Sequence, residues 1–99
     1  MKTKRCTQIE KRIANIKAEL AGIGKMRPGS LTQQYKDRKQ KSGPYYQISY
    51  THKMKSHTNY VSKDCIREVR QQIKNYKRFK KLTTEWVALG IEHSKLSMD

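Results

Sequence analysis

The stretch GPYYQISYTHKMKSHTNYV, residues 43–61, decides the fold of this 99-residue chain. Gly43 and Pro44 interrupt the preceding segment, and the residues that follow are aromatic, β-branched or small and polar, as in β-strands. Two sets of side chains alternate along it, so this strand has two different faces: Tyr46, Ile48 and Tyr50 on one, and Tyr45, Gln47 and Ser49 on the other. A connector at residues 52–55 leads into a second strand at residues 56–61. The stretch therefore predicts a β-hairpin with lysines at its tip.

One face of this hairpin is expected to lie beneath a helix. Its core residues are expected to be aromatic and aliphatic, with phenol groups that reach water: Tyr46, Ile48, Tyr50 and Tyr60. Upstream, the turn Met26–Leu31 contains Pro28 and Gly29 and precedes a possible third strand at residues 31–35. Residues 36–42, KDRKQKS, have no apolar side chain and predict a basic loop.

A helix is expected from Lys4 to the glycines at positions 22 and 24. Its apolar residues follow one another at gaps of three and four, which is a heptad seam: Cys6, Ile9, Ile13, Ile16, Leu20 and Ile23. Such a seam can pack inside its own chain or against a second chain, and the sequence favours neither. We expect two parts, an N-terminal oligomerisation helix at residues 1–25 and a hairpin and long-helix domain at residues 26–99.

A long helix is expected from Lys63 to about Leu96, capped by Ser62 or Asp64. Its apolar spacing skips one step near Phe79, which predicts a bend or a change of packing partner, and Gly90 predicts a break or fraying. The first half also carries a basic stripe: Lys63, Arg67, Arg70, Lys74, Lys77 or Arg78, and Lys81. The second half is expected to serve packing or assembly through Trp86 and Leu89, together with Ile9, Ile13, Ile16 and Leu20 of the first helix.

The charge balance points to a polyanionic partner. Lys and Arg total 23 against 8 Asp and Glu, which gives a formal net charge of +15, and only 34% of the residues are apolar. Nucleic acid is the usual partner of a small protein with this balance, and a membrane surface is the less usual one. No run of apolar residues is long enough for a membrane span or a signal peptide, so we expect a cytoplasmic protein. Cys6 and Cys65 are then expected to be free thiols packed on helix faces.

Enzyme motifs are missing from the sequence. It has no phosphate-binding glycine loop, no His-Glu-x-x-His helix and no CxxC pair. His52, His57 and Cys65 do not have a standard zinc-ligand spacing, and the glutamates lie beside lysines as ordinary solvated charges. We therefore expect a non-enzymatic protein without a metal or a cofactor.

The expected function is nucleic-acid binding, with DNA favoured over RNA. Phosphate contacts are assigned to basic residues of the loop, the hairpin tip and the helix: Lys36, Arg38, Lys39, Lys41, Lys53, Lys55, Arg67, Arg70, Lys74, Lys77, Arg78 and Lys81. Base contacts are assigned to the hairpin: Tyr45, Gln47, Ser49, Thr58 and Asn59. A β-ribbon can enter a major groove, and tyrosines can also stack single-stranded bases, so both substrates stay open.

An alternative function is that of a homodimeric accessory factor. In this interpretation paired chains bridge a larger nucleoprotein complex, such as a transposase, a recombinase or an RNA-guided nuclease. The heptad seam and the Trp86-bearing end of the last helix support it. The two functions differ in their binding to bare nucleic acid, which is tight and steeply salt-dependent in the first and weak in the second.

Several short motifs also carry a family resemblance. RPGSL occupies residues 27–31, GPYY with Ser49 and Tyr50 follows, and Tyr60-Val61 leads into the basic run from Glu68 to Phe79. The chain resembles a family of small basic prokaryotic proteins that share this turn, hairpin and long helix, over residues 26–96. The resemblance implies the order of elements and an association with mobile elements or their defence, but no established activity.

The family pattern differs in one respect. Many members carry a cysteine cluster between the turn and the hairpin, which would suit zinc, whereas residues 37–42 of this chain contain no cysteine. The hairpin and helix also resemble, more distantly, the N-terminal arm-binding domains of tyrosine recombinases, which read DNA with a three-stranded sheet. The predicted fold class is α+β, with an N-terminal heptad helix, a small antiparallel sheet and a long C-terminal helix.

Overall fold

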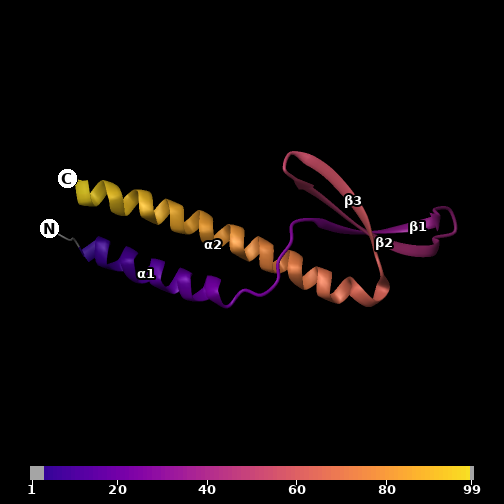
Figure 1. Cartoon of the computed structure of the whole chain (residues 1–99), viewed down its shortest axis with the longest axis horizontal. Helices are drawn as coiled ribbons and strands as arrows, with labels where there is room; N and C mark the ends of the chain where they lie inside the picture. The colour runs from indigo at the N-terminus through magenta and orange to yellow at the C-terminus, as the bar shows by residue number, and fades with distance from the viewer. Residues whose placement is uncertain (1–3, 99) are drawn as a thin grey trace. The chain divides into compact units, whose positions relative to one another are not determined.

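A computed structural model describes residues 4–98 of the chain and confirms the α+β class (Figure 1). Along the chain, one helix precedes and another follows a three-stranded antiparallel sheet with the strand order β1-β2-β3. A short 3-10 turn, η1, precedes the long helix. The elements are α1 (Lys4–Ala21), β1 (Ser30–Asp37), β2 (Ser42–His52), β3 (Lys55–Val61), η1 (Lys63–Cys65) and α2 (Ile66–Met98).

The predicted hairpin and third strand are both present, and their connections are shorter than expected. Only Lys53 and Met54 form the tip of the β2–β3 hairpin, with φ angles of 52° and 65°, so the expected connector at residues 52–55 was too long. Two-residue hairpin turns with both φ angles positive match the twist of the strands that they join. The basic loop expected at residues 36–42 is likewise a four-residue turn, Arg38–Lys41, because β1 extends through Asp37.

Asp37 stabilises this second turn. Its carboxylate accepts hydrogen bonds from the backbone N–H groups of Lys39 and Gln40, at 3.0 and 3.2 Å. Lys41 and Gly43 close the turn with positive φ angles of 52° and 65°. An aspartate that bonds the backbone two residues ahead is a common way to fix a tight turn, so the cations here are held on an ordered connection.

The chain divides into two compact units, and the division differs from the expected boundary at residue 26. The sheet unit comprises residues 25–76. The helix-pair unit comprises, within the described chain, residues 4–24 and 77–98. α2 therefore begins in one unit and ends in the other. The skipped apolar step near Phe79 lies close to this change of packing partner.

The core of the sheet unit lies between the sheet and the first turns of α2. Ile48 is fully buried and clusters with Val61, Val69 and Ile73, and further apolar side chains pack around them: Leu31, Tyr46 and Ile66. The backbone N–H of Arg27 donates to the carbonyl of Gln72, and the Asn75 amide donates to the carbonyl of Lys25. The segment before β1 is therefore anchored along the same helix.

Tyr60 is not a core residue, contrary to expectation. It pairs with Gln47 across β2 and β3, whereas Ile48 pairs with Asn59 and Tyr46 with Val61. Because side chains alternate between faces along a strand, Tyr60 lies on the face opposite Ile48, where 71% of its surface is exposed.

The helix-pair unit is an antiparallel pair formed by α1 and the C-terminal part of α2. Cys6, Ile9, Ile16 and Leu82 are its buried apolar residues. Bidentate ion pairs join Arg5 to Glu92 and Arg12 to Glu85. Glu10 lies 3.2 Å from His93, and Lys17 lies over the ring of Trp86 at 5.4 Å.

The heptad seam of α1 is thus occupied within the chain. Ile9 and Ile16 have no exposed surface, so they are not accessible to a second chain, while the other predicted oligomerisation residues are half-buried: Ile13, Leu20, Trp86 and Leu89. The break expected at Gly90 does not occur, because α2 continues through it to Met98. The cooperativity of a long packed helix outweighs the weak propensity of one glycine.

Candidate nucleic-acid interface

The face of the sheet opposite Ile48 is polar over its whole central part, and we call it the open face. It is defined by the pairing register of the three strands, in which even-numbered residues of β1 and β3 oppose odd-numbered residues of β2. All ten of its central side chains are uncharged, and most are exposed: Ser30, Thr32, Gln34, Tyr45, Gln47, Ser49, Thr51, Ser56, Thr58 and Tyr60. The open face therefore offers hydroxyl, amide and phenol groups to a ligand.

Four of the five predicted base contacts lie together on the open face, namely Tyr45, Gln47, Ser49 and Thr58. The hydroxyl groups of Ser49 and Thr58 are 3.4 Å apart across the two strands. Asn59 does not join them, because its pairing with Ile48 places it on the opposite face.

Sequence reasoning missed other members of this face, above all Thr32, Gln34 and Tyr60. The alternation of β1 was visible in the sequence. Its face could be assigned only once Thr32 was seen opposite Gln47 and Gln34 opposite Tyr45. A register shift of one residue would have moved every one of these side chains to the other face.

Cations gather at both ends of the open face. Arg38, Lys39 and Lys41 form the β1–β2 turn with Lys36 just before it, and Lys53 and Lys55 lie at the β2–β3 tip. The 11 residues of β2 separate the two turns. An extended strand rises by about 3.4 Å per residue, so the two basic turns lie roughly 35 Å apart.

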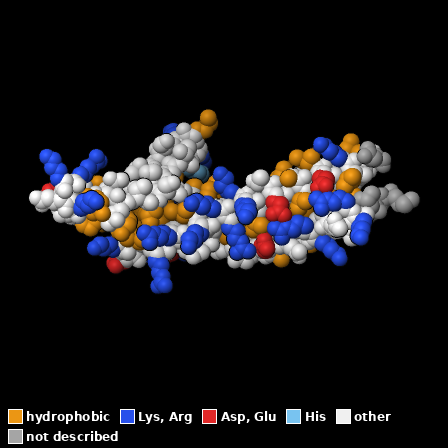
Figure 2. Space-filling view, turned by 180° about the vertical axis from the view of Figure 1, so that it is seen from behind, with side chains coloured by type: hydrophobic (Ala, Val, Ile, Leu, Met, Phe, Trp, Pro, Cys, Tyr) orange, Lys and Arg blue, Asp and Glu red, His pale blue; other side chains and the backbone are white. Residues whose placement is uncertain are grey.

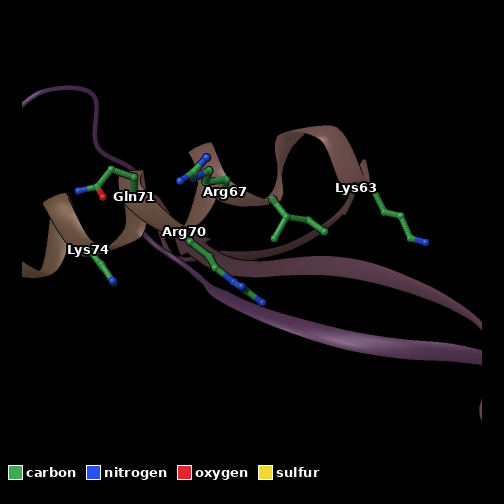
Figure 3. A pocket seen from close by; sticks show the side chains of 6 residues that line it. Lys63, Arg67, Arg70, Gln71 and Lys74 are labelled. Atoms are coloured by element: carbon green, nitrogen blue, oxygen red, sulfur yellow. The ribbon is translucent and has the colours of Figure 1, made fainter.

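A basic groove forms a separate site on α2 (Figure 3). Its lining comes from η1 and the first turns of α2 and contains four cations and no carboxylate: Lys63, Ile66, Arg67, Arg70, Gln71 and Lys74. Ile66 is the apolar member of this lining, and it also packs against the core of the sheet unit. The groove confirms that these four residues of the predicted basic stripe share one side of the helix.

The groove and the open face are not one continuous surface. The start of α2 covers the Ile48 face of the sheet through Val69 and Ile73, so the groove belongs to the covered side. The predicted surface that joined loop, tip, hairpin and helix is thus divided between two sides of the sheet unit. Lys77, Arg78 and Lys81 are exposed on the part of α2 that belongs to the helix-pair unit.

Figure 2 shows Lys and Arg side chains over both units, with few Asp and Glu among them. Two of the described acidic residues, Glu85 and Glu92, form ion pairs with arginines in the helix-pair unit. The hydrogen bond from Arg12 lowers the pKa of Glu85, and the hydrogen bond from Arg5 lowers the pKa of Glu92, in both cases against a smaller effect of burial. Both carboxylates are therefore stabilised as anions by arginine, which suits structural ion pairs rather than proton transfer.

An aromatic stack on the Ile48 face was also missed from the sequence. The ring of Tyr50 stacks on that of His57 with centroids 5.0 Å apart, and the guanidinium of Arg27 lies 4.9 Å from the Tyr50 ring. Arg27 Nε is buried without a hydrogen-bond partner among the described residues. The flat guanidinium is thus held by the ring, and this stack ties the segment before β1 to the outer half of the hairpin.

Within residues 4–98, no three His, Cys, Asp or Glu side chains lie close enough together to hold a metal ion. Neither cysteine forms a disulfide; Cys6 is buried in the helix pair, whereas Cys65 is exposed rather than packed on a helix face. Neither helix, over its described length, has an apolar stretch that could cross a bilayer.

No protein-family model matches the sequence, and no similar chain is found among curated proteins or solved structures.

Proposed function

We propose that this protein binds nucleic acid without catalysing a reaction, DNA in preference to RNA, through the open face and its two basic turns. The observation that carries the proposal is the arrangement of an uncharged, hydrogen-bonding face between two clusters of cations. Phosphates attract cations and position a protein, while uncharged amides and hydroxyls read base edges. The arrangement suits a ligand with polar bases flanked by phosphates.

The dimensions support DNA as the ligand. Three strands spaced by about 4.8 Å make a face roughly 10 Å across, close to the width of about 12 Å of a B-form major groove. The major groove of an RNA helix is too narrow to admit such a face. Gln47 lies on the central strand and can reach an adenine edge with both atoms of its amide.

The basic groove on α2 adds phosphate contacts on the covered side of the sheet unit. Its four cations can bind the phosphate backbone of DNA that passes along this side of the sheet unit. The groove has no carboxylate that would repel a phosphate. In this proposal the groove contributes affinity and salt dependence, and the open face contributes selectivity. Lys77, Arg78 and Lys81 are separate candidate phosphate contacts on the helix-pair unit.

The accessory factor is a second candidate, favoured by one observation. Val87 and Ile91 are 62% and 53% exposed on α2, and they lie one helical turn apart with Met98 two turns further on. An exposed apolar stripe suits helix contacts with a partner. In this second proposal a cytoplasmic homodimer forms through this outer stripe, since Ile9 and Ile16 of the expected seam are buried within the chain.

The test is the affinity of the full chain for duplex DNA, single-stranded DNA and structured RNA across a salt series, with its mass determined by light scattering. Submicromolar duplex binding that falls steeply with salt supports the DNA-binding function. Weak binding to all three ligands contradicts it and leaves the accessory function, which then requires a dimer or a nucleoprotein partner. A preference for RNA would refute the assignment of DNA.

A further inference from the structure

A cleft lies at the end of the open face that is nearer the β1–β2 turn. It is lined by Tyr35, Lys36, Pro44, Tyr45 and Tyr60, and it is open to solvent. Tyr45 and Tyr60 belong to the open face, and they are diagonal neighbours because Tyr60 pairs with Gln47, two residues along β2 from Tyr45. Diagonal neighbours on adjacent strands are about 7–8 Å apart at their backbones, which is within reach of two aromatic side chains.

The exposure of Tyr60 is not explained by the fold. Tyr46 and Tyr50 of the same hairpin are half-buried by packing, whereas 71% of Tyr60 is in contact with solvent. An exposed ring loses the stabilisation that burial would supply. A ligand that covers the ring would recover it, and a ring beside a second ring is best covered by a flat aromatic group.

Lys36 supplies the charge of this cleft. Its side chain lies across Gly43 of the neighbouring strand, so closely that a Cβ at Gly43 would lie 3.1–3.2 Å from three of its carbon atoms. The absence of a side chain at Gly43 thus leaves room for the lysine stem at the rim. The cleft contains one cation and no carboxylate. Its chemistry matches a flat ring joined to an anion.

We propose that this cleft binds one unpaired nucleobase, which stacks on Tyr45 and Tyr60 while Lys36 binds the phosphate beside it. The inference rests on the proposed function and narrows its substrate to DNA with an unpaired base next to duplex, such as a bulge or a junction between single and double strand. A paired base cannot enter, because its two ring faces are stacked inside the duplex. Stacking on tyrosine changes affinity by roughly 5- to 150-fold per base.

The test compares two DNA probes that differ only in one extra, unpaired 2-aminopurine. Binding of the full chain to the bulged and the fully paired duplex is measured by anisotropy, and stacking is measured by quenching of the 2-aminopurine. We expect the wild type to prefer the bulge by at least fivefold and to quench its fluorescence. Tyr60→Ala should remove both effects, whereas Tyr60→Phe should keep them because the ring is retained.

The outcomes separate this inference from the proposed function. Equal affinity for the two probes, or a bulge preference that survives in Tyr60→Ala, would refute binding of an unpaired base in the cleft, while the proposed binding of duplex DNA would still stand. Failure to bind either probe would overturn both. Tyr60 is exposed, so its substitution should leave the fold intact, and circular dichroism of each variant checks this. Lys36→Gln is a second variant: it should weaken binding of the bulged probe while the quenching at saturation persists.

Discussion

Removal of three cations from the two turns should weaken DNA binding far more than removal of three cations elsewhere. The turn variant carries Lys39→Gln, Lys53→Asn and Lys55→Gln. Asparagine is chosen at position 53 because the φ angle there is 52°, a value that asparagine adopts more readily than most residues. The control variant carries Lys4→Gln, Lys11→Gln and Lys95→Gln, which change exposed residues of the helix-pair unit. Both variants lower the formal net charge from +15 to +12.

The expected magnitude follows from the number of phosphate contacts. Each contact contributes about 0.9 to the slope of log affinity against log salt concentration, so three lost contacts should lower the slope by about 2.7. At about 0.1 M salt this corresponds to a loss of affinity on the order of a few hundredfold. The control should retain nearly the wild-type slope, because its three lysines make no phosphate contact in the proposed interface, and any effect of net charge alone is the same in both variants.

The assay is a titration of labelled duplex DNA with each protein at four or more salt concentrations, followed by anisotropy. A larger effect of the turn variant than of the control supports contacts at the turns. Equal slopes for the two variants would refute the reasoning, since binding would then depend on net charge alone. Circular dichroism and light scattering of both variants exclude loss of fold or a change of mass as the cause.

Three further predictions concern stability and use urea unfolding followed by circular dichroism. The pKa of Glu85 is lowered in the folded protein from its ordinary value of 4.5, so its ion pair with Arg12 stabilises the fold above pH 4.5 and loses this effect as the pH falls below that value. Glu85→Gln should remove this part of the pH dependence of the unfolding free energy. A pH profile that is unchanged in the variant would contradict the prediction. Ile48→Ala should destabilise by about 2–5 kcal/mol, because the side chain is fully buried; a cost below about 1 kcal/mol would contradict the described core. Gly29→Ala should destabilise the fold by roughly 1–3 kcal/mol, because φ is 143° and a Cβ there would lie 2.7 Å from Ile48. Gly90→Ala should instead stabilise α2 by about 0.5–1 kcal/mol, because a Cβ there meets no atom within 4 Å. Stability changes of the same sign for both variants would refute this comparison.

The sequence predicted each element because the signals for each element are local. Alternation from Tyr45 to Tyr50 specifies a strand, and gaps of three and four from Cys6 to Ile23 specify a helix. Turn lengths were overestimated, because Asp37 and the left-handed residues Lys53 and Met54 allow tighter connections than polar composition suggests. The continuity of α2 through Gly90 was also missed, since packing and helix cooperativity outweigh local propensity.

The candidate site could be predicted only in part. Net charge and the basic residues of the turns were visible in the composition, and so was the polar character of one hairpin face. The sequence did not show that Asn59 leaves this face, that Tyr60 joins it, or that the basic groove lies on the covered side of the sheet unit. Each of these depends on strand register or on the position of α2 on the sheet.

Sequence by itself therefore determined the order of the elements, the period of each one and the basic character of the protein. Only the tertiary structure decided which partner covers each apolar face: the heptad seam of α1 packs on the end of α2, and the start of α2 packs on Ile48. The physical reason is that periodicity specifies which residues share a face within one element. It does not specify which other element, or which other chain, buries that face, because apolar contact is not directional.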